Sequence, residues 1–379
     1  MKLDPPARLY ADADAAHKEA DGYLSRLVNG GNDAKTLRGV SIDEPRIENS
    51  YRFEDVPEIM AAYRAYLGRR KPVLNKIGVI IDPTAPPVTN VTKDSDLPAW
   101  MEWQYFKMEF VAKFYANYSK KMSDQNRIAL VVAQDYLDHN TQVAPYQAYG
   151  AHLPLVSTDL YNNAGINEAF GMDLLRSVSK GKSLLVNGAG YSARNPSRFQ
   201  RTLANSMLRA DGVITWIYTY ASKYRYRYFF IKPNMLDDRG RSLLDSWKPE
   251  YWDILSKTYS GMKKAEPYIS DTTSTAQVGV LYSMRSVVAE SAQGSALSSQ
   301  ILRNALYTFN ALQDIHRSVE ACMLEGLTPE KLRRYRVLYL IDGQSLTADE
   351  CARLRRWVQD GGTLVVSGRT GLKDEWGRT

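Results

Sequence analysis

The stretch LPLVSTDLYNNAGINEAFGMDLLRSVSKGKSLLVNGAGY, residues 153–191, contains the repeating unit that decides the fold. It begins with a short apolar run bounded by turn residues, which predicts a buried strand over residues 153–161. Apolar residues then recur at helical spacing over residues 171–181, and a second buried strand is predicted over residues 183–191. Strands that alternate with helices build a parallel sheet, so the sequence predicts an α/β protein.

The same alternation extends on both sides of this unit. Further helices are expected over residues 11–31, 56–70, 99–122, 196–210 and 249–265, and further strands over residues 37–42, 127–134 and 211–220. Together these segments predict a sheet of five parallel strands. The proline-rich residues 71–98 have no apolar period, so they predict a long loop.

A second unit is expected after the Ser- and Thr-rich residues 266–277, which we interpret as a linker. Strands are predicted over residues 278–283, 335–342 and 363–368, with helices over residues 298–313 and 347–362. Thr347 and Glu350 have the spacing of a capping box at the start of the second of these helices. The pattern predicts a small doubly wound domain that stops after its third strand.

Composition limits the classes of function. The 379 residues are 44% hydrophobic and 24% charged, which is typical of about two globular domains. No apolar run approaches the roughly 20 residues of a membrane span, and no signal opens the chain, so we expect no membrane partner. The compartment is expected to be cytoplasmic, or outside the cell if a signal precedes Met1. The net charge is +7, but the basic residues are scattered, so nucleic acid is not an expected partner.

Cysteines and histidines show no metal-binding pattern. Cys322 and Cys351 lack a C-x-x-C spacing and lie in sequence that we interpret as helical, which indicates reduced structural thiols. The four histidines lie far apart, so no metal site is expected. The 25 tyrosines and seven tryptophans suit either a hydrophobic core or the stacking of sugar rings.

Candidate functional residues lie where the predicted strands end, because ligands of parallel α/β proteins bind at the carboxyl ends of the strands. These residues are Asp43, Glu44, Gln134, Asp135, Asp159, Tyr161, Asn187, Trp216 and Tyr218. A second carboxyl group nearby and partial burial both raise the pKa of a carboxyl group, which suits a general acid. The pair Asp43 and Glu44 fits that role; alternatively, Glu44 caps the next turn or pairs with Arg46.

Five segments carry a family resemblance through their order in the chain. They are RGVSIDEP (38–45), DLPAWMEWQYF (96–106), STDLY (157–161), ADGVITWIYTY (210–220) and LRRWVQDGGTLVVSGRTGLKDEWG (354–377). This order resembles the family 42 glycoside hydrolases, the β-galactosidase group with a TIM barrel and a flavodoxin-like trimerisation domain. The resemblance implies barrel strands four to eight within residues 1–268 and a truncated flavodoxin-like domain over residues 277–379.

The resemblance also implies roles for residues. Glu44 takes the place of the family's general acid/base, and Asp43 stands where the family has asparagine. The candidate contacts to a carbohydrate substrate are then Asp43, Tyr161, Asn187, Trp216 and Tyr218, although the two aromatic residues of the last strand fit a core equally well. No metal or organic cofactor is implied, and the expected assembly is a homo-oligomer such as a trimer.

Two departures from the family pattern matter. Asn187 stands where the family has its nucleophilic glutamate, and an amide cannot form the glycosyl ester. Asp159 is the nearest substitute, either as a catalytic carboxylate or as an acceptor for a sugar hydroxyl. The first three barrel strands are also absent, so we expect the chain to be a fragment of a longer protein.

Two alternatives to the hydrolase hypothesis remain open. The first is a catalytically inactive relative that binds carbohydrate or serves in assembly, which Asn187 favours. The second is an amidotransferase-like activity of the second unit, which requires a cysteine on a sharp turn after a strand. Both cysteines lie in sequence that we interpret as helical, which counts against it.

Overall fold

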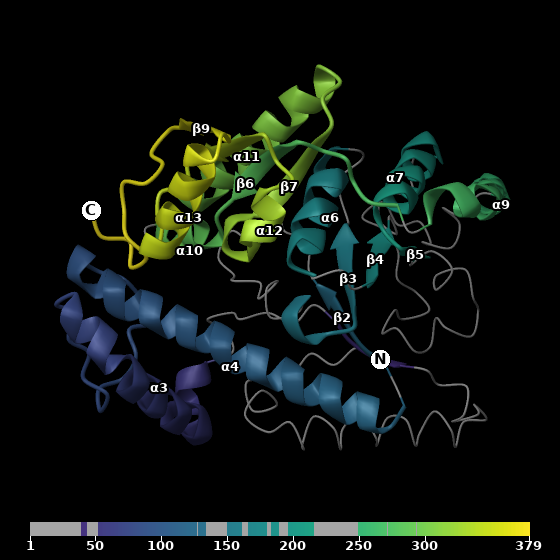
Figure 1. The fold of residues 1–379 in the computed structure, drawn as a ribbon. Coiled ribbons are helices and arrows are strands. Elements are labelled where there is room, and N and C mark those ends of the chain that lie inside the picture. Colours follow the sequence, from purple (N-terminus) through teal and green to yellow (C-terminus); the bar gives the residue numbers. More distant parts are fainter. Residues whose placement is uncertain are drawn as a thin grey trace, which may run out of the picture.

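The computed structural model describes residues 39–43, 52–126, 128–133, 150–160, 166–179, 183–188, 196–215, 249–270, 272–292 and 294–379. These residues form two parallel sheets with helices around them (Figure 1). The expected helix over residues 11–31 lies outside the described residues.

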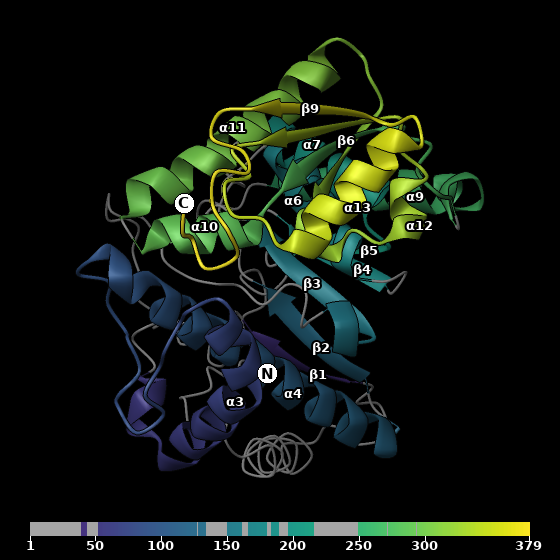
Figure 2. The ribbon, with the colours of Figure 1, turned by 60° about the vertical axis from the view of Figure 1, so that its left-hand side comes forward.

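The first sheet has five parallel strands in the order of the chain. They are β1 (Gly39–Asp43), β2 (Ile128–Ala133), β3 (Leu155–Leu160), β4 (Ser183–Gly188) and β5 (Gly212–Thr215). Figure 2 shows them one after another, with the second sheet beyond them. All five predicted strands are confirmed. Because parallel crossovers are right-handed, this sequential order places the connecting helices on one face of the sheet.

A helical pair connects β1 to β2. The short 3-10 turn η3 (Phe53–Asp55) leads into α3 (Pro57–Lys76), and η4 (Asp94–Asp96) leads into α4 (Leu97–Asp124). The predicted loop over residues 71–98 is therefore wrong at its start, because α3 continues through Pro72. Leu74 is 3% exposed, so burial of this last turn offsets the hydrogen bond that proline removes.

The aromatic residues of α3 and α4 fill a core. The ring of Tyr63 lies 4.8 Å from that of Trp103 and 5.0 Å from that of Phe106, and Tyr66 lies 5.5 Å from Phe106. All four side chains are almost fully buried. For this aromatic segment the core interpretation is therefore confirmed.

The second sheet has four parallel strands in the order β7-β6-β8-β9. They are β6 (Val278–Tyr282), β7 (Val319–Met323), β8 (Val337–Ile341) and β9 (Thr363–Ser367). The sequence prediction of three strands missed β7. Cys322 was expected in a helix and lies on β7 instead, so that expectation is wrong. Cys351 lies in a helix, as expected.

Helices flank the strands of both sheets. They are α6 (Ile166–Val178), α7 (Pro196–Arg209), α9 (Pro249–Ile269), α10 (Met284–Ser291), α11 (Ser295–Asp314), α12 (Pro329–Leu332) and α13 (Ala348–Gln359), with the 3-10 turn η7 (Leu324–Gly326) after β7. The predicted capping box of α13 is present, with Thr347 and Glu350 bonded to each other's backbone N–H groups. The predicted linker is shorter than expected, because α9 extends to Ile269.

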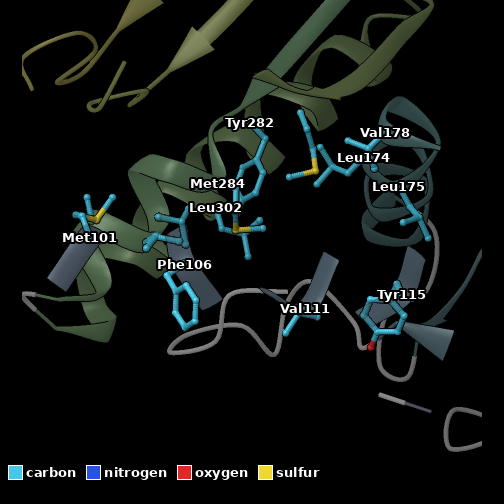
Figure 3. Packing of buried hydrophobic residues seen from close by; sticks show 14 of the residues in the cluster. Met101, Phe106, Val111, Tyr115, Leu174, Leu175, Val178, Tyr282, Met284 and Leu302 are labelled. Carbon is cyan, nitrogen blue, oxygen red and sulfur yellow. The ribbon is translucent and has the colours of Figure 1, made fainter. Parts of the chain in front are cut away.

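The two sheets share one hydrophobic core. In Figure 3, Leu174 and Val178 of α6 gather with Tyr282 and Met284 of the second unit, and Tyr115 and Val111 of α4 lie beneath them. Polar contacts reinforce this packing. Asp173 of α6 accepts a hydrogen bond from the backbone N–H of Ala321 at 3.2 Å. The helix α6 therefore joins the first sheet to β7.

Candidate functional site

The carboxyl edge of the first sheet aligns three of the predicted site positions. Asp159 of β3 is the direct neighbour of Asn187 of β4 in the strand register. Asp43 of β1 is the neighbour of Val132 of β2, which in turn pairs with Ser157 of β3. Asp43 therefore lies one two-residue step before Asp159 and Asn187 along the strands, and all three are near the same edge of the sheet, as the strand-end rule predicts.

These positions also share one face of the sheet. Val156 is fully buried in the core beneath the helices. Ser157 is the next residue, and strand residues alternate between faces, so it lies on the opposite face. Positions 43, 159 and 187 share that face through the register and the two-residue repeat. Ser157 is itself 0% exposed, and its hydroxyl has no hydrogen-bond partner among the residues that the structure describes.

The remaining predicted residues lie outside the described part of the chain. They are Glu44, Gln134, Asp135, Tyr161, Trp216 and Tyr218. Their roles stay predictions.

A buried carboxylate lies on α4, and the sequence analysis did not single it out. Glu102 is 0% exposed and accepts hydrogen bonds from the Tyr66 hydroxyl at 2.7 Å, from Arg70 at 2.7 and 3.0 Å, and from the Trp376 indole N–H at 2.7 Å. Burial and the neighbouring carboxylate raise the pKa of Tyr66. A carboxylate with four donors has no free lone pair directed at a substrate, so Glu102 is structural.

The sequence around Glu102 contains a pattern that identifies a buried charged residue. Glu102 stands inside the aromatic run WMEWQYFK, at a position that helical spacing buries. Lys107 at the end of this run is buried as well, at 2% exposed. A charged residue within a buried helical stripe requires a partner or a function.

The second sheet has its own ligand-binding position by topology. In a doubly wound sheet, ligands bind at the carboxyl ends of the strands where the strand order reverses, which here is between β6 and β8. The chain itself fills this position. Lys373 forms an ion pair with the buried Glu290 at 2.6 Å, and its backbone oxygen accepts a hydrogen bond from Leu346. The peptide N–H of Gly371 donates to the carbonyl oxygen of Gly343.

The amidotransferase-like alternative receives no support. Cys322 lies within β7 rather than on a turn after a strand, and it is 3% exposed. Burial raises the pKa of its thiol to about 12, which keeps it protonated and unreactive.

Metal ligands do not cluster in the part of the chain that the structure describes. The described residues contain no group of three or more His, Cys, Asp or Glu that is able to hold a metal ion. Within those residues, every helix is too short or too polar to cross a bilayer.

Comparison with known proteins gives a similarity at the level of structure. No family model matches the sequence, and no curated protein matches it. A β-galactosidase of the haloarchaeon Halorubrum lacusprofundi superimposes with a TM-score of 0.67 at 14% identity, over 96% of this chain and 58% of that one. A catalytic mutant of Gan42B, a GH42 β-galactosidase from G. stearothermophilus, gives 0.64 at 16% identity, over 86% and 51%. The β-galactosidase of Bacillus circulans sp. alkalophilus gives 0.63 at 14% identity, over 85% and 50%.

The chain therefore has a fold like that of the GH42 β-galactosidases, which confirms the family resemblance at the level of the fold. It spans about half the length of the Gan42B structure.

Proposed function

We propose that the chain is part of a β-galactosidase-type glycoside hydrolase. Residues 1–268 would supply strands four to eight of a TIM barrel, and residues 277–379 a flavodoxin-like domain. The sequential order β1 to β5 supports the first assignment, because barrel strands follow one another in chain order. The order β7-β6-β8-β9 supports the second, because it is the 2-1-3-4 order of flavodoxin-like sheets.

The proposal rests on one observation: polar residues lie near the carboxyl edge of the first sheet, in a chain with this fold. Glu44 follows directly after Asp43 at the end of β1, and we assign it as the general acid/base that protonates the leaving oxygen. Asp43 is assigned to substrate binding. A general acid keeps its proton near neutral pH when a second carboxyl group lies close to it, which is the role that we propose for this pair.

Asp159 is assigned to the other side of the sugar. It lies on β3, two strands from β1, and two residues farther along the sheet than the position level with Asp43. Retaining glycosidases place their carboxyl groups about 5 Å apart, and inverting enzymes about 6.5 to 9.5 Å apart. We therefore assign Asp159 either as the second catalytic carboxylate or as an acceptor for a sugar hydroxyl.

The second candidate function is a relative that binds carbohydrate without cleaving it or serves in assembly. Asn187 favours it, because this residue of β4 occupies the place that the resemblance gives to the nucleophile. In either case we propose a homo-oligomer such as a trimer, which light scattering of the complete protein tests. A monomer would contradict that part of the proposal.

Hydrolysis of 4-nitrophenyl β-D-galactoside by the complete protein tests the catalytic assignment. Glu44→Gln should lower kcat by about 10²- to 10⁴-fold, because the amide cannot supply the proton. Glu109→Gln is the matched control, since Glu109 lies on the surface of α4 with a side chain that is 42% exposed. Equal rates for Glu44→Gln and the unmodified protein would remove Glu44 from the mechanism. Galactoside binding without turnover would establish the second candidate.

A further inference from the structure

Among the described residues, Lys107 is a buried cation without an ion pair. It lies in the middle of α4 and is 2% exposed. Within that part of the chain it makes no hydrogen bond either; its ammonium lies 5.8 Å from the Trp103 ring centroid, and Glu54 of η3 acts on it only through its charge. Burial lowers the pKa of Lys107 to about 8, so the ammonium is still mostly protonated at pH 7.

Partly buried cations of this protein show how a structural cation is compensated. Lys373 contacts Glu290 at 2.6 Å, and Arg285 forms an ion pair with Glu350. Arg209 contacts Asp173 through two bonds of 2.8 and 3.0 Å. Each of these charges is compensated by a carboxylate within hydrogen-bond distance. Lys107 is not, so its charge is available to an anion from outside the described residues.

The length of α4 places Lys107 above the carboxyl edge of the first sheet. Only residues 125–127 separate the end of α4 from the start of β2, so these two ends are level. The six residues of β2 rise about 17 Å, and a helix covers that distance in about 11 residues. The end of β2 is therefore level with a point near residue 113, and Lys107 lies about 9 Å beyond it.

Lys107 also lies on the face of α4 that packs toward the sheet. Val111, Phe114 and Tyr118 follow it at helical spacing, and all three belong to the core that contains Ala129 of β2. The neighbouring η3 comes after the segment that leaves the end of β1. The ammonium lies near η3, the first described element after β1 in the chain, because Glu54 of η3 acts on it through its charge.

A second donor lies on the same face. Gln104 is three residues before Lys107, so the two side chains are neighbours on the helix surface. Gln104 is 3% exposed, and its amide nitrogen has no hydrogen-bond partner within the described ranges. A buried amide without a partner is costly, as is a buried charge. The described residues thus leave two adjacent donors unsatisfied at the height where a substrate would bind.

We propose that Lys107 and Gln104 bind an anionic substituent, a carboxylate or a sulfate ester, on the sugar that the carboxyl edge of the first sheet receives. The inference rests on the proposed function and names the class of its substrate: acidic rather than neutral galactosides. An ammonium and an amide N–H that converge on one anion form charge-assisted hydrogen bonds, which are stronger in a buried site than in water.

Calorimetric titration of the complete protein with galactose, galactose 6-sulfate and galacturonic acid tests this inference. Both acidic sugars should bind at least roughly 10-fold more tightly than galactose, and the tighter of the two identifies the group. Lys107→Met should abolish this preference and leave the affinity for galactose unchanged. Gln104→Met should reduce the preference by a smaller factor. Lys113→Met is the matched control, because its side chain on the same helix is 63% exposed.

The outcomes separate the inference from the proposed function. Binding of galactose without a preference for the acidic sugars, or a preference that survives Lys107→Met, would overturn the inference alone. Failure to bind any of the three sugars would overturn both. Gln104→Met keeps the test decisive if the lysine variant does not fold.

Discussion

Replacement of Lys107 by methionine should stabilise the protein. Methionine has nearly the length of lysine, and it removes a charge from a site that is 2% exposed and offers no ion pair among the described residues. The folded state disfavours the ammonium, because burial lowers its pKa from 10.5 to about 8, while Glu54 offsets only part of this effect. The unfolded chain exposes the ammonium to water.

The pKa values of Lys107 in the folded and unfolded states set both the size and the pH dependence of the stability that Lys107→Met adds. A gap of about 2.5 between the folded and unfolded pKa values corresponds to about 3 kcal/mol of lost stability at pH 7. Between pH 8 and 10.5 the unfolded chain holds the proton that the folded chain has released, so stability of the unmodified protein rises with pH. The advantage of Lys107→Met should therefore fall to about 1 kcal/mol at pH 10.

Urea unfolding at pH 7, 8.5 and 10, in buffers without sulfate or phosphate, measures this difference. Packing of the methionine is independent of pH, so the change with pH isolates the charge. Lys113→Met, on the surface of the same helix, should change the free energy of unfolding by less than about 0.5 kcal/mol at each pH. A difference between Lys107→Met and the unmodified protein that stays constant with pH, or a destabilised variant, would refute the reasoning.

Three further predictions concern packing and reactivity. In a double-mutant cycle by urea unfolding, Glu102→Gln and Trp376→Phe should be coupled by about 1 to 3 kcal/mol, because their hydrogen bond is buried; additive effects would contradict this. Gly150→Ala should lower the free energy of unfolding by about 1 to 3 kcal/mol, because the new methyl group would lie 2.1 Å from a backbone oxygen of α6, whereas Gly68→Ala in the open interior of α3 should raise it by about 0.5 to 1 kcal/mol. The thiol of Cys322 should resist alkylation at pH 8 until urea is added, as mass spectrometry of the modified peptide would show; labelling in the folded protein at the rate of the unfolded one would contradict its burial.

The sequence predicted those features that depend on local patterns. Five strands of the first sheet and the capping box at Thr347 follow from apolar runs and from the spacing of capping residues. The strand β7 was missed because VEACM is short and contains Glu320, while its burial comes from packing on α6. The extension of α3 through Pro72 was missed for a related reason, since the burial of Leu74 overrides a local penalty.

The candidate site also contains both features that local patterns predict and features that depend on tertiary packing. Asp43, Asp159 and Asn187 lie near the carboxyl ends of their strands, because parallel strands end at a common edge, and their roles stay predictions. The network around Glu102 was beyond local reasoning, since Trp376 lies 274 residues away in the chain. The unpaired state of Lys107 among the described residues also depends on which side chains tertiary packing brings near it.

The shared core between the two sheets has a consequence for how the molecule loses its structure. The C-terminal segment places Trp376 against α4, while α6 packs on β7, so each half buries part of its surface against the other. The stretch 272–277 lacks regular structure, and these contacts join the elements on either side of it. Heating should therefore melt both sheets in one cooperative step with a single calorimetric peak, and halves expressed separately should fold only when mixed.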